Sequence, residues 1–580
     1  MSVSEASVSS EPIAVAPSDS SNAGLALALR VARGSAVLTS VAMVVLVVWV
    51  VVARTLHPVE VEWMTGAMRD AIARARDGQP LYAAPSTSFI SFLYPPLYFW
   101  ITGALARLMG VIMAAKVVSL VATIVTCGAI HHVARQLGAH RAWSIAGGIL
   151  HFGAYSLVLY FYDLERVDPL EGALAMTALA LLLRPGNAAA AAGGALMALA
   201  YFAKQPALLV LVAAIVGLLV SREWKRMWIA AAAGAAVIVP LFVYLHVSTG
   251  GWFEFYCLKL PSRHGIEARL VSTFFIMDLP KAFLLAAATV AFCAPVVRLV
   301  ILRRGPPWRD VVFASVLGAG VAGAFFLRAH DGGWTNVLLA WTPFGCAAVA
   351  VVASRLIDAS ANVRVRSGVE VALCMAFVLQ LLTWSFDPAD LSPGPTDDHN
   401  EATLRAYVKK LEERGEVLVT PMGDVTKVRH FHSAALFDVL RADYPFPEDY
   451  RRDLEAQRFA AIVTAVPNET MCPTESCKVA ATALMASYFI AGHIATPISY
   501  ARIGYKAQPT WVLLPRKKRL DGVPLADLAG RQIAEAAIAE MRFHVALDTT
   551  SPDVPYADIE MLAEEAVTKP AAPKTEPVAP

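Results

Sequence analysis

The stretch that decides the fold runs from residue 35 to residue 54 and reads SAVLTSVAMVVLVVWVVVAR. It carries no charge before its last residue, and a helix needs about 20 apolar residues to cross the hydrocarbon core of a bilayer. The stretch therefore predicts a membrane-spanning helix. Similar stretches recur along the chain, and the predicted spans are 35–54, 112–131, 142–162, 169–184, 187–203, 205–220, 227–247, 282–302, 310–328, 336–354 and 367–386. We predict a polytopic α-helical membrane protein with about eleven spans.

The composition agrees with a chain whose main solvent is lipid. Of the 580 residues, 57% are hydrophobic and 17% are charged, whereas soluble proteins carry about 25% charged residues. The net charge is only +2, and the charges gather between the apolar stretches, as they do in membrane proteins. The composition predicts a lipid bilayer as a partner and gives no indication of nucleic acid binding.

The chain divides into four parts. Residues 1–33 begin with a Ser-, Ala-, Glu- and Pro-rich stretch that lacks the basic start and apolar centre of a signal peptide, so we predict a disordered cytoplasmic N-terminus. Residues 34–386 form the predicted transmembrane module, with a long first outer loop at 55–111. Residues 387–545 form a predicted extracytoplasmic α/β domain, and residues 546–580 form a predicted disordered tail.

Two regions outside the spans carry a recognisable pattern. Residues 95–109 are apolar but short, and they start with two prolines, so we predict a helix that lies in the membrane interface. In the C-terminal domain, apolar runs predict strands and longer periodic stretches predict helices. The expected strands are at 417–419, 461–463 and 511–515, and the expected helices are at 401–414 and 478–492.

Lysine and arginine in the short loops indicate the orientation. With a cytoplasmic N-terminus, thirteen of these residues lie on the inside and seven on the outside, provided that 95–109 is not counted as a span. The sequence therefore predicts that the long first loop and the C-terminal domain are extracytoplasmic.

Under this topology, six polar clusters fall on the outer side. They are Glu60 and Glu62; Tyr94-Pro95-Pro96; Asp163, Glu165, Arg166 and Asp168; Lys204-Gln205-Pro206; Arg263 and His264; and the loop 330–336. Ionisable residues at membrane depth are costly, so a functional role is their default interpretation, although loops also contain polar residues for no further reason. Lys204 interrupts an apolar run and precedes Pro206, which predicts a tight turn between two helices. We predict a site at the outer membrane surface that faces the soluble domain.

Several short motifs resemble a known superfamily. Glu62-Trp63 follows the first span, and Gly78-Gln79-Pro80-Leu81-Tyr82, Phe92-Leu93-Tyr94-Pro95-Pro96-Leu97-Tyr98, Arg166-Val167-Asp168-Pro169-Leu170, Phe202-Ala203-Lys204-Gln205 and His330-Asp331-Gly332-Gly333-Trp334-Thr335-Asn336 come later. Together they resemble the GT-C superfamily of membrane glycosyltransferases, to which protein O-mannosyltransferases and the lipid A aminoarabinose transferase belong. The resemblance covers about residues 35–386 in architecture, and an extracytoplasmic C-terminal domain matches the same plan.

The resemblance implies an enzyme of an inner (plasma) membrane. It would transfer a sugar from a polyprenyl-phosphate-linked donor to a hydroxyl of a glycan, glycolipid or protein on the outer face, with inversion at the anomeric carbon. The catalytic carboxylate of the family lies in the first outer loop and maps onto Glu62 or Glu60. Because residues at i and i+2 do not share a helix face, we expect only one to act and favour Glu62, with Glu60 as the alternative. The expected phosphate-binding residues are Lys204, Arg263 and His264, and those for sugar or acceptor are Arg166, Asp168, Tyr94, His330 and Asn336.

Two other functions fit the same spans. A transporter or flippase would predict ionisable residues near the membrane midplane and internal repeats, and neither is evident. A non-catalytic envelope scaffold is the second alternative. In the C-terminal domain, Cys472 and Cys477 lie close together and predict a disulfide if the domain is extracytoplasmic. Two further ligands for a metal site are missing there. Members of the superfamily differ in their use of a divalent cation, so no cofactor is assigned.

Overall fold

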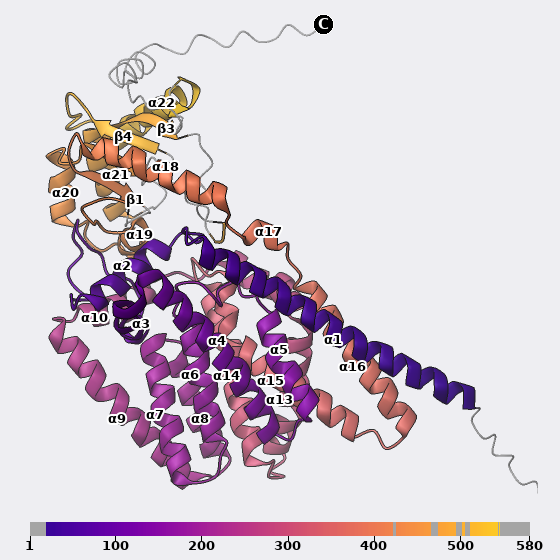
Figure 1. Ribbon diagram of the computed structural model, residues 1–580. Helices are drawn as coiled ribbons and strands as arrows, with labels where there is room; N and C mark the ends of the chain where they lie inside the picture. The colour runs from indigo at the N-terminus through magenta and orange to yellow at the C-terminus, as the bar shows by residue number, and fades with distance from the viewer. Residues whose placement is uncertain are drawn as a thin grey trace, which may run out of the picture.

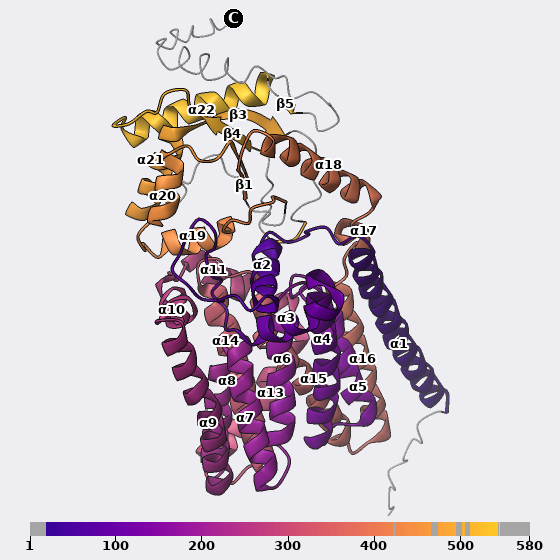
Figure 2. The same cartoon turned by 60° about the vertical axis from the view of Figure 1, so that its left-hand side comes forward.

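The computed structural model describes residues 19–420, 425–465, 474–494, 502–504, 511–542 and 544–545. It consists of a bundle of long helices with a smaller domain stacked on one end (Figure 1). Three short helices lie between the two parts in both views (Figures 1 and 2). They are α2 (Thr65–Arg76) and α3 (Leu97–Met109) from the first loop and α19 (Ser433–Arg441) from the C-terminal domain. This layer contains the segments that carry the candidate site.

Each of the eleven predicted spans coincides with one helix of the bundle. These helices are α1 (Asp19–Leu56), α4 (Val111–Gln136), α5 (Arg141–Gly153), α6 (Asp168–Leu182), α7 (Asn187–Ala203), α8 (Ala207–Val220), α9 (Trp224–Ser248), α13 (Phe283–Ile301), α14 (Trp308–Ala329), α15 (Thr342–Asp358) and α16 (Val363–Thr383). Six of them are long and apolar enough to cross a membrane, namely α1, α4, α9, α13, α14 and α16. The protein is thus a multi-pass membrane protein, while the number of eleven spans stays a prediction.

The predicted span at 142–162 is wrong in its second half. Helix α5 ends at Gly153, and the chain continues in turns in which Leu159 and Tyr160 have positive φ angles of 57° and 61°. The Tyr155 hydroxyl donates to Asp163 Oδ1 at 2.6 Å, and the Arg54 guanidinium donates to the same carboxylate at 3.0 Å. Residues 154–162 are mostly apolar because they are buried in the protein. Hydropathy alone does not distinguish such a buried segment from a lipid-facing helix.

The helices approach one another closely where glycine replaces a larger side chain. At Gly194 of α7, a Cβ atom would lie 2.8 Å from the Cα and the carbonyl carbon of Ala230 in α9 and would clash with the carbonyl oxygen of that residue. At Gly217 of α8, it would lie 2.7 Å from the Cα atom of Val312 in α14. Small residues at such crossings are the usual way in which membrane helices gain van der Waals contact.

The helix expected at 95–109 is α3, which starts directly after Pro95 and Pro96. A proline cannot continue a helix backwards because it lacks the N–H and restricts the residue before it. The tight turn expected around Lys204 is also present, since α7 ends at Ala203 and α8 begins at Ala207. Between α9 and α13 the chain forms α10 (Trp252–Glu254), α11 (Ala268–Thr273), α12 (Leu279–Lys281), a short 3-10 turn (Pro261–Arg263) and two π-helical turns (Phe255–Lys259 and Phe274–Asp278).

The C-terminal domain is an α/β domain, as predicted. Its strands are β1 (Val417–Thr420), β2 (Ala461–Thr464), β3 (Tyr488–Ile494), β4 (Trp511–Pro515) and β5 (His544–Val545), in the sheet order β1-β2-β4-β3-β5. Its helices are α17 (Pro388–Leu391), α18 (Pro395–Glu412), α19, α20 (Glu448–Glu455), α21 (Glu475–Ser487) and α22 (Leu525–Arg542). The pairs β1–β2 and β3–β5 are parallel, and β4 is antiparallel to both β2 and β3.

One helix of the domain was predicted too long. Helix α21 ends at Ser487, and the last residues of the expected helix 478–492 belong to strand β3. The strand is buried along almost its whole length. A fully buried strand shows no alternation of apolar and polar residues, so periodicity does not separate it from a buried helix.

An apolar core joins the domain to the first loop and to the segment after α9. The ring of Phe255 lies 4.7 Å from that of Tyr444, and Trp252 lies 6.1 Å from the same ring. Residues of the first loop and of the C-terminal domain belong to one continuous buried cluster. The domain is therefore packed on the bundle through apolar contacts as well as through the polar contacts described below.

Candidate active site

Glu62 lies in the short connection between α1 and α2. Its side chain is 2% exposed and forms an ion pair with the guanidinium of Arg166, which precedes α6. The other contact of the same carboxylate oxygen is the backbone N–H of Met64, which donates to it at 3.0 Å. Because Met64 directly precedes α2, the carboxylate lies at the positive end of that helix, where a negative charge is favoured.

Burial raises the pKa of the Glu62 carboxyl above its ordinary value, and the nearby Arg166 guanidinium and Met64 N–H offset only part of that rise. A carboxylate with a raised pKa holds a proton more readily than one in water, which is the property that a general base needs. The ion pair fixes where the carboxylate points. Glu62 thus combines an oriented carboxylate with raised basicity.

A second ion pair lies at the neighbouring helix ends. The Lys204 ammonium, in the turn after α7, donates to Asp168 Oδ1 at 2.6 Å, and Asp168 is the first residue of α6. The Asn336 amide donates to the same oxygen at 3.2 Å. The other oxygen, Oδ2, is buried and accepts no hydrogen bond from the described residues. It is therefore a buried acceptor that lacks a hydrogen-bond donor.

The hydroxyl of Tyr94 is within electrostatic range of both ion pairs. Burial raises the pKa of its hydroxyl, and the charges of Arg166, Asp168, Lys204 and Glu62 all act on that pKa. The hydroxyl therefore lies close to both pairs. The structure brings together six of the residues that the sequence analysis singled out: Glu62, Arg166, Asp168, Lys204, Tyr94 and Asn336.

Glu60 has different surroundings from Glu62. Its carboxylate lies 3.8 Å from the guanidinium of Arg69 on α2, and Arg69 also donates to Glu165 at 3.0 Å. Burial would raise the pKa of the Glu165 carboxyl, but the cations of Arg69 and Lys116 outweigh this effect and lower it. The two glutamates of the Glu-Val-Glu segment therefore have different cationic partners, Arg69 for Glu60 and Arg166 for Glu62, although the charge of Glu165 also acts on Glu62.

Arg69 and Lys116 were not among the predicted site residues. Lys116 interrupts the apolar first half of helix α4, where it donates to the backbone carbonyl of Arg54. A buried charge in an apolar run is by itself a signal of a specific partner. That signal was available in the sequence for Lys116, whereas the surroundings of Arg69 within the first loop are too polar for it to stand out.

Three of the predicted site residues lie in another group. The His264 imidazole faces Asp438 of α19 at 3.8 Å, and Asp331 forms an ion pair with Arg441 of the same helix. Burial, together with the nearby charges of Arg441 and His330, lowers the pKa of His264 to about 4, so its ring is neutral near pH 7. His330 pairs with the strand-like backbone at Ile266.

Arg263 is exposed next to His264 and has no ion-pair partner among the described residues. Of the three cations expected to bind phosphate, only Lys204 shares a cluster with Glu62 and Tyr94. Arg263, His264 and His330 lie instead along the contact between the loops after α9 and α14 and the C-terminal domain.

The C-terminal domain covers Glu62 directly. The Ile503 N–H donates to the carbonyl of Val61 at 3.0 Å. Next to it, Gly504 has a φ of 74°, and a Cβ atom there would lie 3.4 Å from Glu62 Oε1. Arg502 anchors this segment through Asp397 of α18 at 2.9 Å. No sequence signal pointed to residues 502–504, because the contact is between segments more than 400 residues apart.

Neither a metal site nor the predicted disulfide is defined by the described residues. Within the parts of the chain that the structure describes, no three His, Cys, Asp or Glu side chains are grouped so that they would hold a metal ion. Cys477 is buried near the start of α21 and is disulfide-bonded, while Cys472 lies outside the described residues. The pairing of Cys472 with Cys477 therefore stays a prediction.

Comparisons with known proteins give structural likeness only. No family model matches the chain, and no curated protein matches it. Among solved structures, ArnT from Cupriavidus metallidurans in the apo state is similar with a TM-score of 0.49 and 13% identity, over 84% of this chain and 98% of that chain. The same protein bound to undecaprenyl phosphate gives a TM-score of 0.47 and 14% identity, over 83% of this chain and 97% of that chain.

Proposed function

We propose that the protein is a membrane glycosyltransferase that moves a sugar from a polyprenyl-phosphate-linked donor to an acceptor hydroxyl, with inversion. The observation that carries the proposal is the position of Glu62. It is a buried carboxylate of raised pKa, oriented by Arg166, and like the Lys204–Asp168 pair it lies where helices of an apolar bundle begin or end. The bundle supplies a surface for a prenyl chain, and the polar cluster supplies groups for the sugar phosphate.

In this proposal Glu62 takes the proton of the acceptor hydroxyl. The acceptor oxygen then forms a bond to the anomeric carbon while the bond from that carbon to the phosphate oxygen breaks, and the phosphate leaves with the electron pair on its lipid. Displacement from the opposite side inverts the anomeric carbon. Base catalysis of this kind typically contributes about 10²- to 10⁴-fold in rate.

Lys204 and Tyr94 are the proposed groups for the leaving phosphate. Burial opposes the charge on Lys204, but the carboxylates of Asp168 and Glu171 outweigh it and raise the pKa of the ammonium, which stays protonated. An ammonium has three N–H groups, and Asp168 occupies one of them, so Lys204 can also donate to a phosphate oxygen. The free oxygen of Asp168 and the amide of Asn336 are the proposed contacts for sugar hydroxyls.

The proposed location is an inner (plasma) membrane, with the site and the C-terminal domain on the outer face. The charged pairs support a surface reaction over transport. Asp168 is the first residue of α6, Lys204 follows the last residue of α7, and Glu62 lies between helices. A transporter would be expected to place such groups near the middle of its helices.

The test compares envelope glycans and glycolipids by mass spectrometry in four strains. One lacks the gene, and the others carry the wild-type protein, Glu62→Gln or Glu60→Gln at equal membrane abundance. We expect a sugar-bearing species to disappear in the deletion strain and to return with the wild type and with Glu60→Gln, but not with Glu62→Gln. Full restoration by Glu62→Gln would remove Glu62 as the base. No difference between the deletion and the wild type would favour the scaffold alternative.

A further inference from the structure

A cavity of about 350 Å³ lies on another flank of α2, between that helix, the first loop and the C-terminal domain. Asp70 and Arg74 of α2 and Asp77 directly after it line the cavity, and their spacing places them on one face of the helix. Arg69, which contacts Glu60 and Glu165, belongs to a neighbouring flank. The cavity is thus separate from the Glu62 cluster, although the same helix forms a wall of both.

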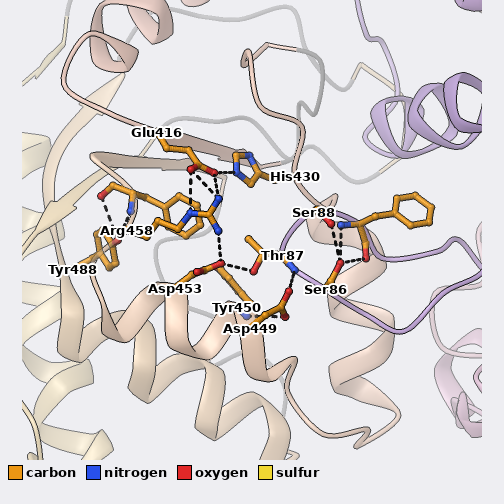
Figure 3. A network of polar contacts seen from close by, with 12 residues as sticks. Ser86, Thr87, Ser88, Glu416, His430, Asp449, Tyr450, Asp453, Arg458 and Tyr488 are labelled. Atoms are coloured by element: carbon orange, nitrogen blue, oxygen red, sulfur yellow. Dashed lines mark hydrogen bonds and ion pairs between the residues drawn. The ribbon is translucent and has the colours of Figure 1, made fainter. Parts of the chain in front are cut away.

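The outer wall of the cavity is a turn of the first loop that is fixed by the C-terminal domain. Ser86 and Phe89 exchange backbone hydrogen bonds of 3.0 and 3.2 Å. Between them, the Thr87 N–H donates to Asp449 at 2.9 Å and its hydroxyl donates to Asp453 at 2.7 Å (Figure 3). The wall is therefore held in place by contacts within the protein itself, which is usual for ligand sites.

His430 is the strongest sign that the cavity takes a ligand. Its side chain is 3% exposed, and its Nε2 atom lies 2.7 Å from Glu416, as Figure 3 shows. The second ring nitrogen, Nδ1, is buried and has no hydrogen-bond partner among the described residues. With Nε2–H donating to the carboxylate, Nδ1 is an acceptor. A buried polar atom without a partner costs about 1–3 kcal/mol, and a hydroxyl of a ligand would satisfy it.

The charges around the cavity balance. Asp70 lies 3.3 Å from the guanidinium of Arg429, and Asp77 is paired with Arg76 at 2.7 Å. Arg74 donates to the Pro80 carbonyl at 2.9 Å, and its guanidinium lies 3.9 Å above the ring of Phe89. No excess of cations is present to attract a polyanion. The mixture of carboxylate acceptors and guanidinium donors instead suits a molecule with several hydroxyl groups, each of which donates and accepts.

We propose that this cavity binds a sugar unit of the acceptor glycan. This inference rests on the proposed function and adds the chemical class of the acceptor, a saccharide without net negative charge. The volume is suited to about one or two sugar rings. Asp70 lies about 8 Å along the helix axis from Thr65, where α2 begins next to Glu62. In this proposal an acceptor of a few linked sugars extends from the cavity along α2 toward the end of the helix at which Glu62 lies.

The test uses the full-length protein in lipid nanodiscs made without maltoside detergents, since these carry sugar headgroups. Saturation-transfer NMR is recorded with maltose, N,N′-diacetylchitobiose and glucosamine, and inorganic phosphate is added as a competitor. Ser88→Trp fills the cavity from its exposed rim, and His430→Phe removes the unpaired nitrogen. Ser272→Trp is the matched control on an exposed helix face outside the cavity, and Glu62→Gln separates binding from catalysis.

We expect at least one saccharide to bind the wild type, Ser272→Trp and Glu62→Gln equally, and to lose five-fold or more of its signal with Ser88→Trp and His430→Phe. Phosphate should not displace it. Ser88→Trp with an unchanged melting temperature should also lower formation of the sugar-bearing product in cells. The proposal is overturned if no saccharide binds, if both cavity variants bind like the wild type, or if phosphate competes. It is overturned as an acceptor site if Ser88→Trp loses binding but leaves product formation intact. Because Glu62→Gln is expected to retain binding, failure of the glycosyltransferase assignment would appear in the strain comparison and not in this binding signal.

Discussion

Among single residues, the buried Glu62–Arg166 ion pair is costly for protein stability, and its place in the candidate site accounts for that cost. Both side chains are 2% exposed, and removing one partner of a buried pair typically costs about 3–5 kcal/mol because the other charge stays buried. A protein with two apolar residues of similar size in place of a buried ion pair is often equally stable. The proposed role of Glu62 as a base explains the presence of Arg166. The guanidinium orients the Glu62 carboxylate and limits the rise of its pKa.

We therefore predict that replacing Arg166 changes the pH dependence of the transferase activity. In Arg166→Gln the cation that lowers the Glu62 pKa is lost, so burial raises that pKa further. Since the base must be ionised to act, the acidic limb of the pH–rate profile should move to higher pH. Activity at pH 7 should fall by about 10²-fold or more and recover in part as the pH rises.

The profile is measured with membranes that contain equal amounts of each variant, and Arg166→Lys is the conservative control. Lysine keeps the charge but loses the planar donor geometry of arginine, so its limb should stay near that of the wild type while its rate falls. An unshifted limb in Arg166→Gln would show that Glu62 does not titrate in the rate-limiting step.

The candidate site was only partly predictable from its residues. From the predicted spans, each helix end could be assigned to one side of the membrane. This assignment placed Asp168, Lys204 and Asn336 on the same predicted side as Glu62. The sequence could not show where around the bundle each loop lies. His264 and His330 were therefore expected beside Lys204, whereas the structure places them against α19 of the C-terminal domain.

At the scale of elements, the segment 502–504 is a short piece of the C-terminal domain that lies over Glu62. Its backbone pairs with the chain at residues 61–62, and the left-handed conformation of Gly504 lets the backbone pass close to the carboxylate. A side chain at this position would meet Trp63 Cδ1 at 3.3 Å as well as Glu62 Oε1. We infer that the domain positions Glu62, the proposed base.

This inference predicts different effects for two glycines with the same backbone strain. Gly504 has a φ of 74° and touches the site, whereas Gly522 has a φ of 75° with open space around it. Valine at either position should cost about 1–3 kcal/mol because a β-branched residue disfavours this conformation. Only Gly504→Val should also lower turnover by ten-fold or more at matched folded abundance. Equal activity of the two variants would argue against a role of this segment at Glu62.

Comparison of the predicted and observed elements shows that hydropathy predicts where helices lie but not always where they end. Helix positions follow from apolar stretches of sufficient length, and every such stretch corresponds to a helix. The ends were misjudged where apolar residues are buried in turns, as after Gly153, or in a strand, as after Ser487. In both places tertiary burial, and not the membrane or a helix face, accounts for the apolar residues.

Close helix crossings predict a strong dependence on residue size. Gly194→Leu should clash with the backbone of Ala230, and overpacking of this kind costs about 1–3 kcal/mol or more. Gly318→Leu on α14 is the matched control, because nothing lies within 4 Å of a Cβ atom at that exposed position. We expect Gly194→Leu to lower the melting temperature in detergent and Gly318→Leu to leave it unchanged or to raise it. Equal melting temperatures would mean that α7 and α9 separate at no cost.

In the molecule as a whole, ion pairs occur among the loop cations on both predicted sides of the membrane. Seven Lys and Arg residues lie in the short loops predicted to be outside. Three of these, Arg166, Lys204 and Arg328, are buried in ion pairs with Glu62, Asp168 and Asp278. On the predicted inside, three loop cations are likewise paired, Arg226 with Glu223, Arg355 with Asp310 and Arg366 with Asp358. Because the bias counts Lys and Arg residues and their acidic partners contribute little to it, the excess of thirteen over seven remains the basis of the predicted orientation.

The orientation predicts where a fluorescent protein that folds only in the cytoplasm will emit. A fusion after Pro580 should stay dark, because the C-terminal domain is predicted to be outside, and a fusion after Gly305, between α13 and α14, should fluoresce. An alkaline phosphatase reporter, active only outside, should give the reverse pattern at the same two positions. The two positions control for expression, since each reporter must be active at one of them. A fluorescent fusion after Pro580 with a dark one after Gly305 would place Glu62 and the whole layer around α2 and α3 on the cytoplasmic face. The acceptor would then have to be a cytoplasmic molecule, and the proposed reaction at the outer surface would be excluded.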